Sequence, residues 1–313
     1  MIKYLAKRMG RSLITLFFIM TLVFILLRLM PIEGYFDNFD KLTEEQIQVG
    51  LEGMGLTDPM PVQLVHFFED LLHGDLGVSR RYRSNVAVTE ILASKIPISV
   101  QLGSMSILLS LLCGLPMGIL MTKNKGKMFD KIGTLFIVFI QAVPAMVYFL
   151  FIQLYGTTLL NVPLLFDASN PICWILPVFS MSLGNTAYYG MWLRRYMVDE
   201  STKDYVKLAK AKGVSEGQIM VKHIFKNAFV PLIQYLPTSF LNTVIGSIYI
   251  ESLYSVPGMG GLLVDVIKKN DNNMVQAIVL LYAIVGVIGL LLGDILMTAV
   301  DPRISLSKKG GGR

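Results

Sequence analysis

Residues 204–215 read DYVKLAKAKGVS, and residues 222–228 continue as KHIFKNA. This stretch predicts a helix, a turn centred on Gly213 and a second helix, because glycine tolerates the left-handed backbone of a tight turn. Ala209, Ala211 and Gly213 are small enough to let another backbone approach closely, and the surrounding lysines keep the element out of a bilayer. We therefore expect an exposed helical element that contacts a partner.

The chain around this element is apolar enough to be solvated by lipid. Hydrophobic residues make up 53% of the 313 positions and charged residues only 16%, against about 25% charged residues in a soluble domain. Stretches of about twenty nearly uncharged residues can cross a hydrocarbon core, and they must be helical because lipid cannot satisfy open backbone groups. Six spans are predicted, near residues 12–30, 98–121, 132–156, 172–193, 228–252 and 276–300.

The first span is expected to be retained. Basic residues precede an apolar run from Ser12 to Leu27, as in a secretory signal. However, the run is long, and its exit at Leu29-Met30-Pro31 lacks a small-residue cleavage site.

The distribution of basic residues predicts that both termini are cytoplasmic. Twenty of the 28 Lys and Arg residues fall in the N-terminal tail, the loops 122–131 and 194–227, and the C-terminal tail. The opposite side carries only eight, while eleven Asp and Glu residues lie in 31–96 alone. Basic residues collect on the cytoplasmic side of membrane proteins. This asymmetry accounts for the net charge of +6, which therefore gives no support to a nucleic-acid partner.

Residues 31–96 form an extracytoplasmic segment in which short soluble-type helices are expected. Thr43-Glu44-Glu45-Gln46 reads as a capping box that opens a helix ending at Gly53 or Gly55. A second helix runs from about Pro61 to Leu72, closed by His73-Gly74, and the segment is expected to cap the outer mouth. The predicted divisions are 1–30 (tail and first span), 31–96, 97–303 (a five-helix core containing loop 194–227) and 304–313 (a disordered tail).

Nothing in the sequence indicates catalysis, a metal site or a cofactor in this chain. The phosphate-binding pattern G-x-x-x-x-G-K-[ST] is absent, so nucleotide hydrolysis would have to come from another chain. G-x-S-x-G occurs at 213–217, but no strand precedes it, and His66 and His73 lie across the membrane from it. The histidines, together with Cys113 and Cys173, are too scattered to form a metal site.

The stretch 204–228 resembles the EAA-type coupling loop of ABC importer permeases, in the variant Y-V-x-x-A-x-A-K-G of the dipeptide, oligopeptide and nickel branch. In that family the short helix around the glycine docks into a groove on the ATPase subunit and transmits its closure to the membrane helices. Lys207 stands where the generic motif has Glu and Lys226 where it has Pro, as in the peptide branch. The resemblance assigns this role to Tyr205, Lys207, Ala209, Ala211, Gly213, Val214, Ser215 and His223.

Other stretches resemble the same branch along nearly the whole chain. Residues 74–79, GDLGVS, look like its G-D-L-G-x-S motif, and the exit of the first span is similar, although Ile32-Glu33-Gly34 replaces the usual Pro-Gly-Asp-Pro. Residues 251–260, ESLYSVPGMG, resemble the outer re-entrant segment of the family, and Asp301-Pro302-Arg303 resembles its C-terminal signature.

Helix breakers after residue 255 predict an outer gate. Pro257, Gly258, Gly260 and Gly261 interrupt the helix where the chain turns back, and such backbone is tolerated at membrane depth only when it is buried in protein or lines a cavity. The predicted gate residues are Glu251, Pro257, Gly258 and Gly260.

Ionisable and small residues in the later spans are open to more than one interpretation. Glu251 and Asp294 are functional candidates by their position in spans, but we expect both to lie close enough to an interface to be hydrated, with capping or interhelical hydrogen bonding as the alternative role. Gly289 and Gly293 form a G-x-x-x-G pattern that would let another helix pack closely.

Polar residues within the third and fifth spans are candidates for the translocation path. A conduit for a peptide backbone needs dispersed, weak donors and acceptors, although hydrogen bonds between helices would produce the same pattern. The candidates are Gln141, Gln234, Asn242, Thr243 and Ser247.

The resemblance implies an all-α, six-span permease of the type I ABC importer fold in a bacterial cell membrane. This subunit would pair with a second, similar permease, with two ATPase subunits that bind the ATP, and with an extracytoplasmic solute-binding protein that delivers short peptides. Nickel or another small solute is the alternative cargo. A secondary transporter driven by an ion gradient is the rival mechanism, but the ionisable residues lie toward the interfaces and not at the midplane.

Overall fold

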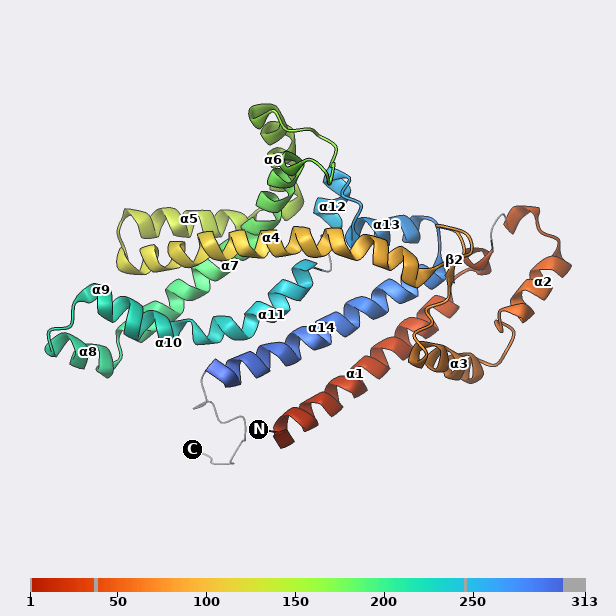
Figure 1. Cartoon of the computed structure of the whole chain (residues 1–313), viewed down its shortest axis with the longest axis horizontal. Coiled ribbons are helices and arrows are strands. Elements are labelled where there is room, and N and C mark those ends of the chain that lie inside the picture. Colours follow the sequence, from red (N-terminus) through yellow and green to blue (C-terminus); the bar gives the residue numbers. More distant parts are fainter. Residues whose placement is uncertain (1, 37–38, 245–246, 301–313) are drawn as a thin grey trace.

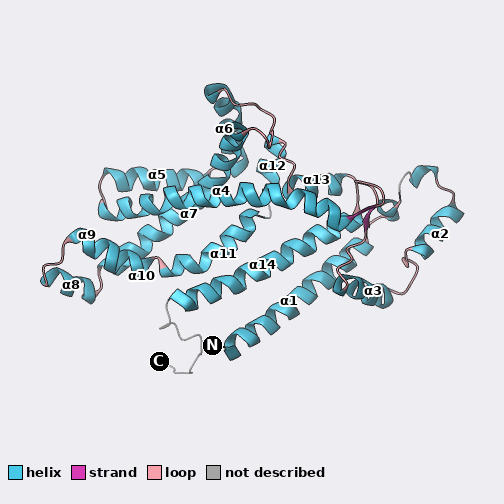
Figure 2. Cartoon of the chain, in the orientation of Figure 1, coloured by secondary structure: helices cyan, strands magenta, loops and turns pink. Residues whose placement is uncertain are grey.

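The computed structural model describes residues 2–36, 39–244 and 247–300, and these ranges are mostly helical (Figures 1 and 2). The α-helices are α1 (Ile2–Arg28), α2 (Glu44–Gly53), α3 (Met60–Leu72), α4 (Val88–Lys123), α5 (Met128–Ala142), α6 (Ala145–Leu160), α7 (Ile175–Ser201), α8 (Asp204–Ala211), α9 (Glu216–Gln218), α10 (Lys226–Ala228), α11 (Val230–Val244), α12 (Ile248–Tyr254), α13 (Met259–Lys268) and α14 (Asn272–Val300). The other elements are the short helices η1 (Ile32–Tyr35), η2 (Phe39–Lys41) and η3 (Pro171–Trp174), the π-helix η4 (Ile219–Phe225), and the paired strands β1 (Val78–Ser79) and β2 (Val86–Ala87).

Among the described residues, three helices are long and apolar enough to cross a membrane: Met9–Arg28 of α1, all of α4, and Asn272–Leu296 of α14. Two bent pairs raise the number to as many as five if each counts as one span: α5 with α6, bent by 106°, and α12 with α13, bent by 86°. α7 covers the fourth predicted span but is not among the helices that meet these criteria.

The predicted spans 132–156 and 228–252 are not continuous helices. The first breaks after Ala142 because Val143 is extended, which the following Pro144 favours by clashing with a helical preceding residue. The second is interrupted at Ser247, which is extended (φ −100°, ψ 111°) and caps α12, beginning at Ile248.

α4 and α7 pack side by side along most of their length, and α4 lies in front of α7 in Figure 1. Their contacts keep one offset of 72 positions: Ser106 and Ser110 donate side-chain hydrogen bonds to the carbonyls of Val178 and Ser182, at 3.4 and 3.0 Å. The next two turns pair Gly114 with Thr186 and Gly118 with Gly190. A β-carbon at either α4 glycine would lie within 2.9 Å of a carbonyl oxygen of α7. The two helices therefore run parallel at close distance.

α11 and α14 form a second close pair, and the predicted use of the G-x-x-x-G pattern is confirmed. A β-carbon on Gly289 would lie 3.2 Å from Thr238 Cα, and one on Gly293 would collide with the carbonyl oxygen of Gln234. At position 293 only glycine permits this approach.

The two helices predicted within residues 31–96 are confirmed. The capping box at Thr43 and Gln46 is present at the start of α2. α3 ends at Leu72, followed by His73 and by Gly74 at φ +75°. Stacked ring pairs join α3 to α1, with centroids 5.0 Å apart for Phe68–Phe17 and 5.1 Å for Phe67–Phe24. α3 therefore lies against α1, and α2 lies beyond it at the edge of the molecule (Figure 1). The predicted C-terminal motif 301–303 and tail 304–313 lie outside the described residues.

Candidate functional site

The stretch 204–228, called here the coupling element, folds as the predicted helix, turn and second helical segment. Gly213 has φ +74°, and its N–H donates to the carbonyl of Lys210 at 3.0 Å. The N–H of Val214 donates to Ala209 O at 3.2 Å, so the end of α8 is closed by backbone bonds that need a left-handed residue at the turn. The second segment contains the seven-residue π-helix η4, which no sequence pattern predicted.

One face of the coupling element is packed firmly onto α7. Val206, only 1% exposed, and Ala209 point inward from α8 and join a cluster with Ile219, Ile224 and the α7 residue Met197. The opposite face is open. It carries Lys207, Leu208, Ala211, Lys212 and Gly213, and the Leu208 side chain is 56% exposed.

The Tyr205 hydroxyl connects three helices of this region. It donates to Glu200 at the end of α7 (2.6 Å) and accepts from the Asn227 amide of α10 (3.0 Å). Burial, followed by the bond to Glu200, raises the pKa of Tyr205, so the hydroxyl keeps its proton. The sequence carried no signal for Glu200 or Asn227, because their role depends on the tertiary contact.

The eight residues assigned to this element lie together but in different settings. Lys207 pairs with Asp204 at 2.8 Å on the exposed side of α8, where such a pair stabilises little. Ser215 is exposed, whereas Val214 and His223 are half-buried. The remaining members are Tyr205, Ala209, Ala211 and Gly213, described above.

A partly buried ion pair ties α7 to the first turn of α5. The Arg194 guanidinium meets the Asp130 carboxylate in a fork, with N···O distances of 2.5 and 2.7 Å. Asp130 also accepts the N–H of Gly126 at 2.8 Å. Sequence reasoning missed this pair, since Arg194 and Asp130 lie 64 positions apart.

Glu251 holds together the hairpin formed by α12 and α13. Its carboxylate accepts from Ser99 Oγ of α4 (2.8 Å) and from the N–H groups of Gly260 (2.6 Å) and Gly261 (3.1 Å). The residue is fully buried, as is Asp294, so the expectation that both are hydrated was wrong. A neighbouring helix covers each, and the alternative role in interhelical hydrogen bonding is the one observed.

The other predicted gate residues shape this hairpin. Pro257 is exposed at the turn, whereas Gly258 and Gly260 are buried. A β-carbon on Gly258 would overlap Ser99 Oγ and the Glu251 carboxylate, and one on Gly260 would lie 2.7 Å from the backbone nitrogen of Ile248. The helix break predicted for this segment is therefore present, and the close contacts at Gly258 and Gly260 are possible only because these two residues lack side chains.

The five candidates for the translocation path lie in different settings. Gln234 donates to Asp294 at 3.1 Å, Thr243 bonds Ser239 O at 2.7 Å, and Ser247 caps α12 by accepting from Ile250 N at 3.3 Å. Gln141 and Asn242 are exposed.

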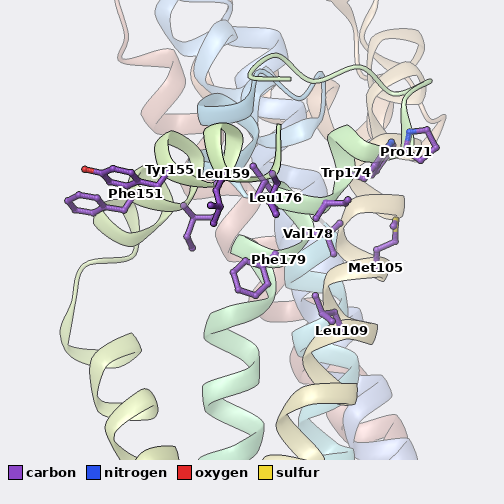
Figure 3. Close-up of a pocket in the computed structure, with 14 residues that line it drawn as sticks. Met105, Leu109, Phe151, Tyr155, Leu159, Pro171, Trp174, Leu176, Val178 and Phe179 are labelled. Carbon is purple, nitrogen blue, oxygen red and sulfur yellow. The ribbon is translucent and has the colours of Figure 1, made fainter. Parts of the chain in front are cut away.

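A groove of about 740 Å³ between α4, α6 and α7 contains none of these candidates. Figure 3 shows its apolar lining, which includes Met105, Phe151, Tyr155, Trp174 and Phe179. Such a surface suits hydrocarbon better than a polar substrate.

Comparison with known proteins decides the family. A family model described as "Binding-protein-dependent transport system inner membrane component" matches residues 114–306, and the model of the corresponding N-terminal component matches residues 1–103. The chain belongs to the permease family of binding-protein-dependent ABC importers. Such a permease is a multi-pass protein of the bacterial cell membrane and a transport protein, not an enzyme. It works with an ATPase and a solute-binding protein.

Relatives of this permease cover nearly its full length. The "Dipeptide transport system permease protein DppB" of Lactococcus lactis subsp. cremoris (strain MG1363) is 32% identical over 98% of this chain and 100% of its own. The "Nickel import system permease protein NikB" of Staphylococcus aureus (strain bovine RF122 / ET3-1) is 30% identical over 96% of this chain and 92% of its own.

The fold is similar to that of a permease chain in the inward-facing MetNI methionine ABC transporter. The TM-score is 0.54 at 14% identity, and the match covers 68% of this chain and 97% of the other.

Proposed function

We propose that this permease forms half of a translocation path for short peptides, and that a second, similar permease forms the other half. The similarity to the dipeptide permease of Lactococcus lactis over the whole chain supports the cargo. Nickel is the second candidate, because the Staphylococcus aureus relative is almost as similar.

The observation that carries the proposal is the two-sided coupling element. Its open face, with Leu208, Ala211 and Gly213, docks on one of two ATPase subunits, which bind the ATP. Its other face is joined to α7 by Val206 and by the Tyr205 hydroxyl, so a movement of the docked face is passed to the membrane helices. We expect this chain itself to need no cofactor.

We place both termini in the cytoplasm and count six spans, formed by α1, α4, α5 with α6, α7, α11 with α12, and α14. The parallel packing of α4 and α7 supports this arrangement, because the basic loops that follow these two helices then lie on one side of the membrane. The α12–α13 hairpin, with Glu251, Pro257, Gly258 and Gly260, lies on the other side and serves as the outer gate.

The test compares Gly213→Arg with Gly74→Arg in the assembled complex. Both glycines have φ close to +75°, and both face open space, so strain and bulk are matched while only Gly213 lies in the coupling element. Purification in mild detergent should recover the ATPase with the wild-type permease and with Gly74→Arg, and lose it with Gly213→Arg. Equal recovery of the ATPase with both variants would rule out a docking role for the coupling element.

The cargo is tested separately by uptake into proteoliposomes that hold the wild-type complex and its binding protein. Labelled di- to pentapeptides should accumulate with ATP, and ⁶³Ni²⁺ should not. Accumulation of nickel alone would replace the peptide proposal by its alternative.

A further inference from the structure

α7 has a face that its two nearest partners leave open. α4 covers the side with Thr186 and Gly190, as the close glycine contacts show. α5 and the turn before it cover a second side, where Gln141 reaches Met191 and Asp130 meets Arg194. The remaining side carries Asn185, Tyr188, Trp192, Arg195 and Tyr196, and α11 contacts it through Tyr235, Ser239 and Thr243.

Four aromatic rings follow one another along this face and are called here the aromatic ladder: Tyr188, Trp192 and Tyr196 of α7, and Tyr235 of α11. Tyr235 stacks on Tyr188 with centroids 4.2 Å apart, and Trp192 stacks on Tyr196 at 5.5 Å. Tyr188 and Trp192 are 6.1 Å apart. The three α7 rings recur every four residues, so they form one stripe along the helix. Each ring is half-buried.

Polar and charged groups accompany the ladder. The Arg195 guanidinium lies 5.0 Å from the centre of the Trp192 ring, and the residue is exposed. Asn185 accepts from Ser239 (3.1 Å) and donates to Thr243 (3.4 Å), so a strip of amide and hydroxyl groups continues the face toward the start of α7.

This composition differs from that of a surface facing lipid. The exposed large side chains of α6 are Met146, Val147, Leu150, Phe151, Leu154, Tyr155, Leu159 and Leu160. The open face of α7 instead presents an arginine, an asparagine and aromatic rings with polar tips. An amide such as that of Asn185 is costly against lipid tails and is found on faces that line hydrated paths or contact protein, and Arg195 extends this face into the basic segment 194–227.

We propose that the aromatic ladder is this permease's wall of the peptide path, an inference that rests on the proposed function. The rings offer flat apolar surfaces for side chains and peptide planes, and their π-faces attract the ammonium group of a peptide. Each contact is weak, and successive rings lie one turn apart, so a peptide can move from one to the next without tight binding. Arg195 provides a cation for the peptide carboxylate.

Solvent access to the ladder can be measured by cysteine labelling. Trp192→Cys is placed in a background with Cys113→Ala and Cys173→Ala, in the assembled complex in proteoliposomes. A membrane-impermeant, charged methanethiosulfonate should label it in at least one of the nucleotide-free and ATP-trapped states, and saturating peptide-loaded binding protein should slow the labelling. Tyr155→Cys on α6 is the matched control, because Tyr155 belongs to an exposed stacked pair with Phe151 that faces the apolar groove. It should stay unlabelled.

Absence of labelling at Trp192→Cys in both states would overturn the proposal and assign this face to the contact with the second permease.

A second measurement does not depend on cysteine chemistry. Trp192→Ala should lower peptide uptake about three- to tenfold, the loss of one aromatic contact, and Trp192→Phe should restore most of it. Uptake by Tyr155→Ala should equal that of the wild type. Equal uptake by Trp192→Ala and the wild type would also overturn the proposal.

The experiments distinguish failure of the proposed role of the aromatic ladder from failure of the proposed peptide cargo. The wild-type complex reports the cargo through its own uptake of peptide or nickel, whereas labelling of Trp192→Cys reports the path. A labelled cysteine that peptide does not protect would show a hydrated wall that peptides do not touch, and would reject the ladder as their contact surface.

Discussion

Ser79 and Asp271, 192 positions apart in the chain, share a hydrogen bond of 2.7 Å in the interior of the protein. The same Asp271 oxygen accepts the N–H groups of Arg80, Arg81 and Tyr82 at 2.9–3.0 Å. One fully buried carboxylate at the start of α14 thus holds the turn that follows the motif GDLGVS.

Asp271→Ala should destabilise the protein strongly. It removes the shared acceptor of Ser79 and three backbone N–H groups, and each buried donor left unsatisfied costs about 1–3 kcal/mol. Partial entry of water will reduce the sum, so we expect a loss of about 3 kcal/mol, measured as a lower Tm in detergent. Glu69→Ala, an exposed position on α3, is the control and should melt with the wild type. Equal melting of Asp271→Ala would show that the turn finds other partners.

Glu251→Ala should loosen the α12–α13 hairpin and leave the rest of the fold in place. Ser99 and the N–H groups of Gly260 and Gly261 lose their acceptor, whereas Glu251→Gln keeps one. The rate of backbone hydrogen exchange at residues 256–262, measured by mass spectrometry, should rise in Glu251→Ala and rise less in Glu251→Gln. It should stay unchanged in Ser252→Ala, a control at an exposed position. Unchanged exchange at residues 256–262 in Glu251→Ala would show that the Glu251 carboxylate does not hold the hairpin together.

The two ion pairs near the coupling element should differ in strength. The Asp130 side chain is 7% exposed and the Arg194 side chain 30% exposed. Asp130→Ala should therefore lower the free energy of unfolding by about 2 kcal/mol. Asp204 and Lys207 are both exposed, so Asp204→Ala should lower the free energy of unfolding by less than about 0.5 kcal/mol. Thermal melts of both variants and of the double variant Asp130→Ala/Arg194→Ala test this. The double variant should recover part of the loss, and similar losses for Asp130→Ala and Asp204→Ala would refute the ranking.

Tyr205→Phe should weaken the transmission of movement without removing the docked ATPase. The hydroxyl is the only group lost, and with it the bonds to Glu200 and Asn227, each worth about 1 kcal/mol. Stimulation of ATP hydrolysis by the loaded binding protein should fall severalfold while the ATPase still co-purifies. Tyr155→Phe serves as the control. Full stimulation in Tyr205→Phe would show that the packing of Val206 and Ala209 is sufficient.

Features with short, fixed spacing could be predicted from the sequence. The capping box at Thr43, the turn at Gly213 and the close packing at Gly289 and Gly293 each depend on residues a few positions apart. Local sequence determines such features.

Features that depend on tertiary pairing could not be predicted. Asp130 with Arg194, Ser79 with Asp271 and the aromatic ladder all join distant segments. The breaks in two spans were missed because apolar windows average over them, although Pro144 marked the first. Hydropathy estimates depth along one helix and says nothing about which helix covers a side chain, which explains the error at Glu251.

Contacting residues of α4 and α7 are 72 positions apart at each of four successive turns, so the two helices form one rigid unit, called here the strut. Sliding by one residue would break every serine and glycine contact along the pair, and only a jump of a whole turn, about 5–6 Å, could restore them. At one end of the strut, α7 is fused to the coupling element. Toward the other end, about 28 Å along α4 from Gly118, Ser99 grips Glu251 in the α12–α13 hairpin. A displacement of the coupling element would therefore reach the α12–α13 hairpin as a rigid tilt, with no need for the helices to bend.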